Sequence, residues 1–176
     1  MSTSLAKPGQ RIIRLAHPLA FAAFLEHIGE PVDRHFRNQG LPMLCDDASA
    51  FVPLVQAWAF FDATARAVGP ALGWHVGSYF GDHNLNHTFV NKLKRAPTLY
   101  QALRLFVRMV SAEASHLQHG IHERRDDIHY YTHYPDMKGV PGYHSSQAYQ
   151  LEIMCDLIRH FTGRQWLPEE IGIEYP

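Results

Sequence analysis

The sequence predicts an α+β domain: a helical N-terminal half, followed by a small antiparallel sheet that two long helices cover on one face. Apolar residues recur at helical spacing from about residue 18 to residue 114. Two short runs rich in Ile, Tyr and Thr then flank the charged sequence RRDD, which is typical of a hairpin. A second long apolar stripe follows. Helix, hairpin and helix in this order favour one shared core.

The helices of the first half are bounded by residues that favour helix ends. One short helix is expected over residues 18–28 and a second over residues 31–40, with Pro31 in its first turn and Gly40 at its end. A third is expected over residues 53–68, with an apolar stripe of Leu54, Ala57, Trp58, Phe61 and Ala65. GPALGWHVGSYFG predicts a further short helix broken by glycines, and NHTFVNKLKRA predicts another.

The two long helices lie on either side of the hairpin. PTLYQALRLFVRMVSAEA predicts a helix that Thr98 caps, with Gln101 completing a capping box and Arg104 and Arg108 facing solvent. The other long helix is expected over residues 143–161, with a glycine cap behind it. The alternating sequence EIGIEY then predicts a final short strand.

The hairpin strands are expected over residues 116–124 and 127–134. A loop of two or of four residues gives the same register, in which His122 faces His129. Side chains alternate along a strand, so we expect one face to carry Leu117, His119, Ile121, Ile128, Tyr130, Thr132 and Tyr134. The other face then carries Gln118, Gly120, His122, His129, Tyr131 and His133.

Five of the 13 histidines lie in residues 115–135, which raises the question of a metal site. A metal ion needs three or four ligands that converge on one point. In the predicted strands only His122 and His129 are close, and a third ligand would have to come from His83 or His87. We therefore expect no metal and no cofactor, with the His122 and His129 pair as the alternative.

Three polar side chains are expected on the inward face of the hairpin: His119, Tyr130 and Thr132. A buried polar group that lacks a partner costs about 1 to 3 kcal/mol. A small polar ligand between the sheet and the helices would be such a partner. These three are the predicted ligand-binding residues, and the alternative is that they bond to one another or to the backbone.

Composition and motifs narrow the class of function. Lys and Arg number 16 against 17 Asp and Glu, a net charge of -1, so no basic surface for nucleic acid or for an anionic membrane is expected. No GxSxG, HExxH, phosphate-binding glycine loop or dinucleotide fingerprint occurs, so an enzyme is not predicted. Cys45 and Cys155 form no CxxC motif, and the first residues lack a signal peptide, which favours a cytoplasmic location without a membrane anchor.

Three motifs in series carry a resemblance to a known family: GPALGWHVGSYFG, RAPTLYQALRLFVRM and GRQWLPEEIGIEYP. In this order and spacing they resemble the N-terminal effector domain of AraC-type transcriptional regulators, in the branch whose domain is labelled arabinose-binding. The resemblance covers residues 17–176, and residues 1–16 are expected to be a flexible N-terminal segment.

The resemblance implies an effector-binding and dimerisation domain that regulates transcription. It implies a small-molecule effector, a homodimer, and contact with DNA only through a helix-turn-helix domain that would follow Pro176 and is absent here. It does not identify the effector. The alternative interpretation is a histidine-rich sensor that binds a metal or haem, and a small enzyme comes third.

Overall fold

The computed structural model describes residues 11–42, 47–83, 88–124, 127–133 and 139–172. For residues 82, 83, 123, 124 and 127–133 the backbone alone is described. These ranges contain two small antiparallel sheets and a set of helices, which confirms the predicted α+β class. The elements are β1 Ile12–Arg14, α1 Ala16–His27, α2 Val32–Asn38, β2 Phe51–Pro53, α3 Leu54–Val68, α4 Leu72–His83, α5 Thr88–Lys94, α6 Leu99–Met109, the 3₁₀ turn η2 Val110–Ala112, β3 Gln118–Arg124, β4 Asp127–His133 and α7 Tyr143–Thr162.

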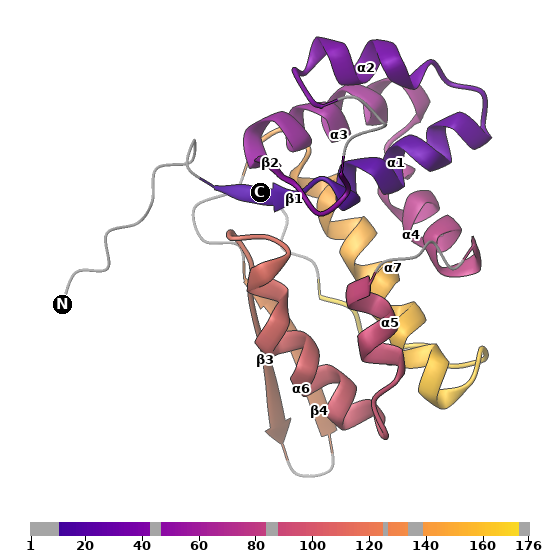
Figure 1. Cartoon of the computed structure of the whole chain (residues 1–176). Helices are drawn as coiled ribbons and strands as arrows, with labels where there is room; N and C mark the ends of the chain where they lie inside the picture. The colour runs from indigo at the N-terminus through magenta and orange to yellow at the C-terminus, as the bar shows by residue number, and fades with distance from the viewer. Residues whose placement is uncertain (1–10, 43–46, 84–87, 125–126, 134–138, 173–176) are drawn as a thin grey trace, which may run out of the picture.

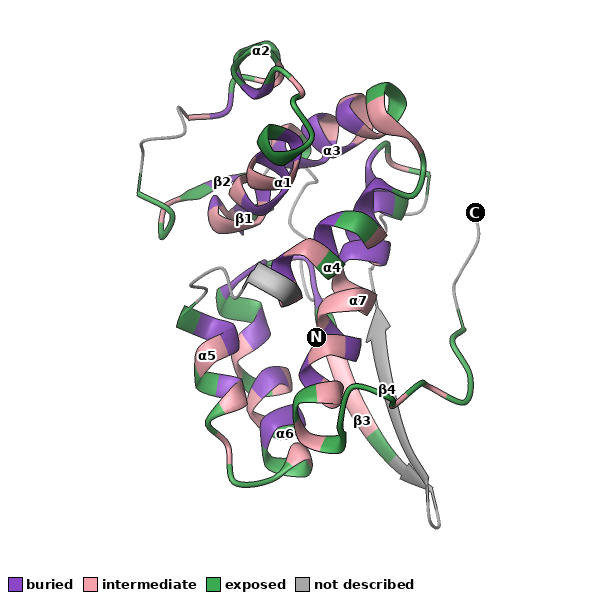
Figure 2. Ribbon diagram, turned by 90° about the vertical axis from the view of Figure 1, so that its right-hand side faces the viewer, coloured by how far each residue is buried: buried purple, intermediate pink, exposed green. Residues whose placement is uncertain are grey.

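The helix α7 connects two groups of elements (Figure 1). The first four helices and the β1–β2 sheet gather at one end, whereas α5, α6 and the β3–β4 hairpin lie at the other. Along its length α7 contacts α3, α4, α5 and α6. Purple, buried positions line the inner sides of these helices in Figure 2, so the core follows α7 through the molecule.

The hairpin has the predicted register. His122 pairs with His129 and Glu123 pairs with Ile128 across two antiparallel strands. The described side chains of β3 alternate as expected, since His119 and Ile121 are partly buried and His122 is exposed. Helix α6 packs against β3, whereas α7 packs mainly against α4, so the covering of the sheet comes chiefly from one of the two long helices.

Helix α4 is continuous, and its glycines do not break it. Gly73, Gly77 and Gly81 recur every fourth residue and face α7. A Cβ atom at Gly73 would lie 2.2 Å from the carbonyl oxygen of Ser145. The prediction of a helix broken by glycines is therefore wrong, because these residues serve the close approach of two helices.

The position of β1 contradicts part of the prediction that residues 1–16 form a flexible segment. Residues 1–10 lie outside the described part of the chain, but Ile12–Arg14 forms β1 and pairs with β2. Ile13 is buried, and Leu15 is fully buried beside it. On the other edge of β1, the Ser115 N–H donates to the carbonyl of Ile12 at 2.9 Å. With hydrogen-bonded partners on both edges of β1, residues 11–16 belong to the folded domain.

The predicted helix boundaries at Thr98 and Gly163 are confirmed, whereas α6 ends at Met109, before the predicted end near Ala114, and the 3₁₀ turn η2 follows it. The Thr98 hydroxyl accepts a hydrogen bond from the Gln101 N–H at 3.3 Å, and Gly163 ends α7 with φ 103°. Residues 170–172, the described part of the predicted final strand, form no strand. Ile171 is 43% exposed there, and residues 173–175, the rest of the predicted strand, lie outside the described part of the chain. In the described ranges, no helix combines the length and apolarity that crossing a membrane requires.

Candidate functional site

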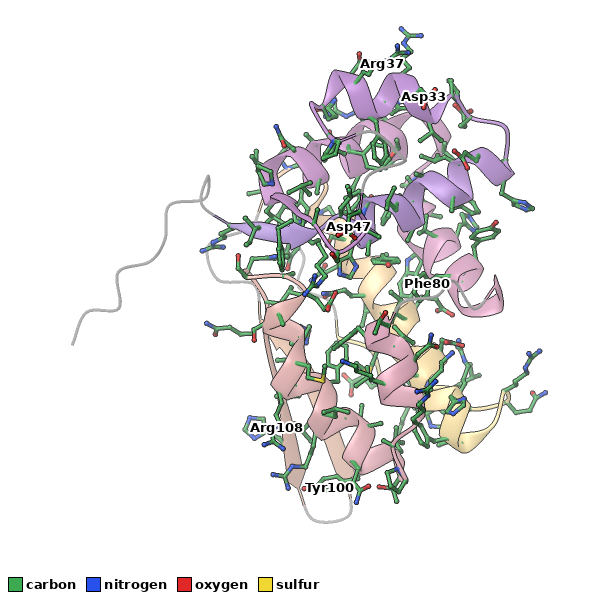
Figure 3. All side chains as sticks on the ribbon, viewed as in Figure 1. Asp33, Arg37, Asp47, Phe80, Tyr100 and Arg108 are labelled. Carbon is green, nitrogen blue, oxygen red and sulfur yellow. The ribbon has the colours of Figure 1, made fainter. Side chains whose placement is uncertain are left out.

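A cavity opens among the helices, close to the middle of α7. Its volume is about 440 Å³, including the space at its mouth. The lining side chains come from α1, α4, α5, α6, η2, α7 and the connection between η2 and β3. Figure 3 shows Phe80 on α4, in the region between α4 and α5. The lining residues are His17, Phe80, Phe89, Val90, Phe106, Val110, Glu113, Leu117, Tyr149, Gln150 and Ile153.

Most of the wall is apolar and aromatic. Phe89 on α5 and Phe106 on α6 lie with their ring centroids 5.4 Å apart, and Phe80 meets Tyr149 edge to face at 6.4 Å. Each of these rings lies on the buried stripe of an amphipathic helix, so burial of the helix faces also brings the rings together. A wall of this kind suits a compact apolar molecule.

One end of the cavity is polar. Glu113, directly after η2, accepts a hydrogen bond at Oε1 from Nε of Arg14 at 3.1 Å. Its other oxygen, Oε2, lies 3.9 Å from Nε2 of His17. The Tyr149 hydroxyl lies 3.5 Å from Nδ1 of His17. The order Arg14, Glu113, His17, Tyr149 therefore forms a chain of polar contacts along this end.

Burial shifts the pKa of two of these polar groups, Glu113 and Tyr149. Desolvation raises the pKa of Glu113, while the Arg14 guanidinium and, more weakly, the charge of Lys92 act in the opposite direction. Burial, together with the negative charge of Glu113, raises the pKa of Tyr149 above its ordinary value. Tyr149 therefore keeps its proton at neutral pH.

Arg14 connects this polar end to the surface. Besides Glu113, its guanidinium donates to the Ser49 carbonyl at 2.7 Å and lies 4.6 Å from the ring centroid of Phe51. Phe51 is 45% exposed on the outer face of β2. The side chain that balances the buried carboxylate thus also contacts the exposed sheet face.

The predicted ligand-binding residues lie on the hairpin beside this cavity. His119 does not line it, but its ring packs edge to face against Phe106 with centroids 5.1 Å apart. Burial lowers the pKa of His119 to about 4, so the ring is neutral at pH 7. Thr132 pairs with His119 and Tyr130 pairs with Ile121 through the backbone. The side chains of Tyr130 and Thr132 lie outside the described part of the structure, so their role stays a prediction.

The alternative metal site rests on His122 and His129, which are partners in the backbone register. His122 is exposed, and the His129 side chain is outside the description. Across the ranges that the structure describes, no three His, Cys, Asp or Glu side chains gather in a way that could hold a metal ion. His83 and His87, the suggested third ligands, have no described side chains.

The residues that build the polar end escaped the reasoning from sequence. One signal was present for Glu113, because it continues the buried positions of Leu103, Phe106 and Val110 at helical spacing. An acidic residue on an apolar stripe is a candidate for a buried, paired carboxylate. No comparable signal exists for His17 or Tyr149, whose neighbours on their helices do not distinguish them.

Comparison of the chain with protein-family models gives no match, and comparison with curated proteins also gives none. The resemblance to AraC-type effector domains therefore stays a prediction from the three sequence motifs.

Proposed function

We propose that this chain is the ligand-sensing and dimerisation domain of a cytoplasmic AraC-type transcriptional regulator. A small-molecule effector binds in the cavity between α4, α5, α6 and α7, and binding controls a C-terminal DNA-binding domain. The role is one of binding and not of catalysis. The observation that carries the proposal is the cavity itself: an apolar, aromatic wall with a few convergent polar groups at one end.

The arrangement of polar groups supports a receptor. The Glu113 carboxylate lies in a largely apolar wall, where burial removes part of its hydration. An aliphatic residue at this position would complete the core without that loss. The carboxylate is paired with Arg14, and His17 and Tyr149 continue the contacts. Such groups fix the orientation of a ligand whose affinity comes from apolar burial.

The outer face of the β1–β2 sheet supports dimerisation. Ile12, Phe51 and Val55 are 39%, 45% and 55% exposed. Ile12 and Phe51 share one face of the β1–β2 sheet, and Val55 follows in the first turn of α3. A compact exposed apolar surface of this kind is a common feature of homodimer interfaces. We propose that a second copy of the chain covers it.

A thermal-shift screen of small apolar and amphipathic metabolites tests the cavity. A ligand at a hundred times its dissociation constant should stabilise the fold by about 2.7 kcal/mol. The Val110→Phe variant, which fills part of the cavity, should lose this stabilisation. Val107→Phe is the matched control, because Val107 lies one turn earlier and does not line the cavity. A ligand that stabilises both variants equally binds elsewhere and contradicts the proposal.

A further inference from the structure

The cavity contains a charge that is already balanced. Among the described lining residues, Glu113 is the one Asp, Glu, Lys or Arg side chain. Arg14 pairs with it from outside the lining, at 3.1 Å. Lys92 on α5 is exposed and adds only a weaker positive influence on the carboxylate. A ligand that enters therefore meets an ion pair and not an uncompensated charge.

A charged ligand would disturb this balance. An ammonium group would compete with Arg14 for Glu113, and a carboxylate group would be brought beside a second carboxylate. Either ligand would also give up its hydration to enter a wall formed mainly by Phe, Val, Leu and Ile side chains. Burial of an unpaired charge is strongly unfavourable, so an uncharged molecule is preferred.

The polar end nonetheless offers both kinds of hydrogen-bonding group. The Glu113 carboxylate accepts hydrogen bonds, whereas the Gln150 amide can both donate and accept. A ligand hydroxyl can donate to Glu113 and accept from the Gln150 amide, whereas a ligand carbonyl can only accept.

On the basis of the proposed function, we propose that the effector is an uncharged alcohol or phenol with a compact apolar body. Its hydroxyl group lies at the end formed by His17, Glu113 and Tyr149, and its apolar body lies among the phenylalanine rings.

A matched series of phenylethyl compounds tests this assignment on the purified chain at pH 7. The series consists of 2-phenylethanol, 2-phenylethylamine, 3-phenylpropanoate and ethylbenzene, with binding measured by calorimetry. We expect 2-phenylethanol to bind tightest, with the two charged compounds about tenfold or more weaker. Ethylbenzene should be weaker by about twofold to tenfold, the range that one net hydrogen bond gives.

The Glu113→Gln variant gives a second, independent readout. It removes the negative charge but keeps the shape, so the Arg14 guanidinium is no longer balanced. Binding of 3-phenylpropanoate should then improve about tenfold over the original chain, while 2-phenylethanol should bind up to about tenfold more weakly, because its hydroxyl loses a charged acceptor. Glu152→Gln is the matched control, since Glu152 pairs with Arg159 at 2.8 Å and does not line the cavity. It should leave the order of the four compounds unchanged.

The outcomes separate this inference from the proposed function. If the amine or the carboxylate binds the original chain as tightly as the alcohol, the uncharged class is wrong while the cavity remains a binding site. If none of the four compounds binds, the inference fails. The proposed function fails as well only if the wider screen gives no ligand that Val110→Phe excludes. If Glu113→Gln does not fold, as judged by circular dichroism, the ranking on the original chain decides the question alone.

Discussion

The packing of α4 against α7 predicts a graded response to alanine along one row of glycines. An added Cβ at Gly73 would lie 2.2 Å from the Ser145 carbonyl oxygen, a backbone atom that cannot turn away. At Gly77 the nearest atom is the Cβ of Glu152, at 2.6 Å. At Gly81 the nearest atoms are 3.0 Å away and belong to the carboxylate end of the Asp156 side chain, which can give way.

The magnitudes follow from two opposing effects. Replacing glycine by alanine inside a helix stabilises it by about 1 kcal/mol, whereas overpacking a tight interface costs about 1 to 3 kcal/mol and sometimes more. We therefore expect Gly73→Ala to lower the free energy of unfolding by about 2 kcal/mol or more. Gly77→Ala should cost about 1 kcal/mol, and Gly81→Ala should lie within about 0.5 kcal/mol of the original chain.

Urea unfolding followed by circular dichroism measures the series. Gly172→Ala is the control, since an added Cβ there meets nothing within 4 Å. Because Phe80 on α4 and Tyr149 on α7 both line the cavity, wedging the helices apart should also weaken ligand binding in Gly73→Ala. Equal stabilities for the Gly73 and Gly81 variants would refute the close approach of α4 and α7.

Three further predictions concern the core, a helix end and the surface. Burial lowers the pKa of His116 to about 3 and of His119 to about 4, below the value of 6.5 at which a free imidazole takes up its proton. The unfolded chain then binds more protons, so stability should fall by about 2 kcal/mol for each ring between pH 7 and pH 5, and a flat urea-midpoint profile would contradict this. Thr98→Ala should cost about 1 kcal/mol of unfolding free energy through loss of the α6 cap, whereas Thr98→Ser should retain it. Phe51→Glu should reduce self-association in sedimentation velocity without lowering the melting temperature, and Leu167→Glu, at a site 73% exposed, should leave self-association unchanged.

Sequence patterns were sufficient wherever a local rule decides the structure. The Thr98 cap and the alternation in the two strands each depend on residues close in the chain, so the start of α6 and the register of His122 and His129 could be predicted. The helical stripe that includes Trp58 likewise placed α3 against the core. In each case the physical cause lies within one element or between neighbours in the chain.

The glycines of α4 show where a local rule fails. Glycine lowers helix propensity, which led to the prediction of a broken helix. The gain that outweighs this cost comes from α7, more than sixty residues later in the chain, because only glycine allows the two backbones to approach so closely. Propensity is a weak guide when a distant partner supplies most of the stabilisation.

The first strand explains why the polar end of the cavity could not be predicted. Three residues are too few for an alternating pattern, so Ile12–Arg14 resembles a polar tail until β2 and residues 113–115 are placed beside it. Once paired, β1 buries Ile13 and carries the Arg14 guanidinium to Glu113, and it sets the start of α1 so that His17 reaches the same carboxylate. The charge balance that favours an uncharged ligand thus depends on contacts separated by about a hundred residues of chain. The pairing of Arg14 with Glu113 therefore forms only in the folded chain.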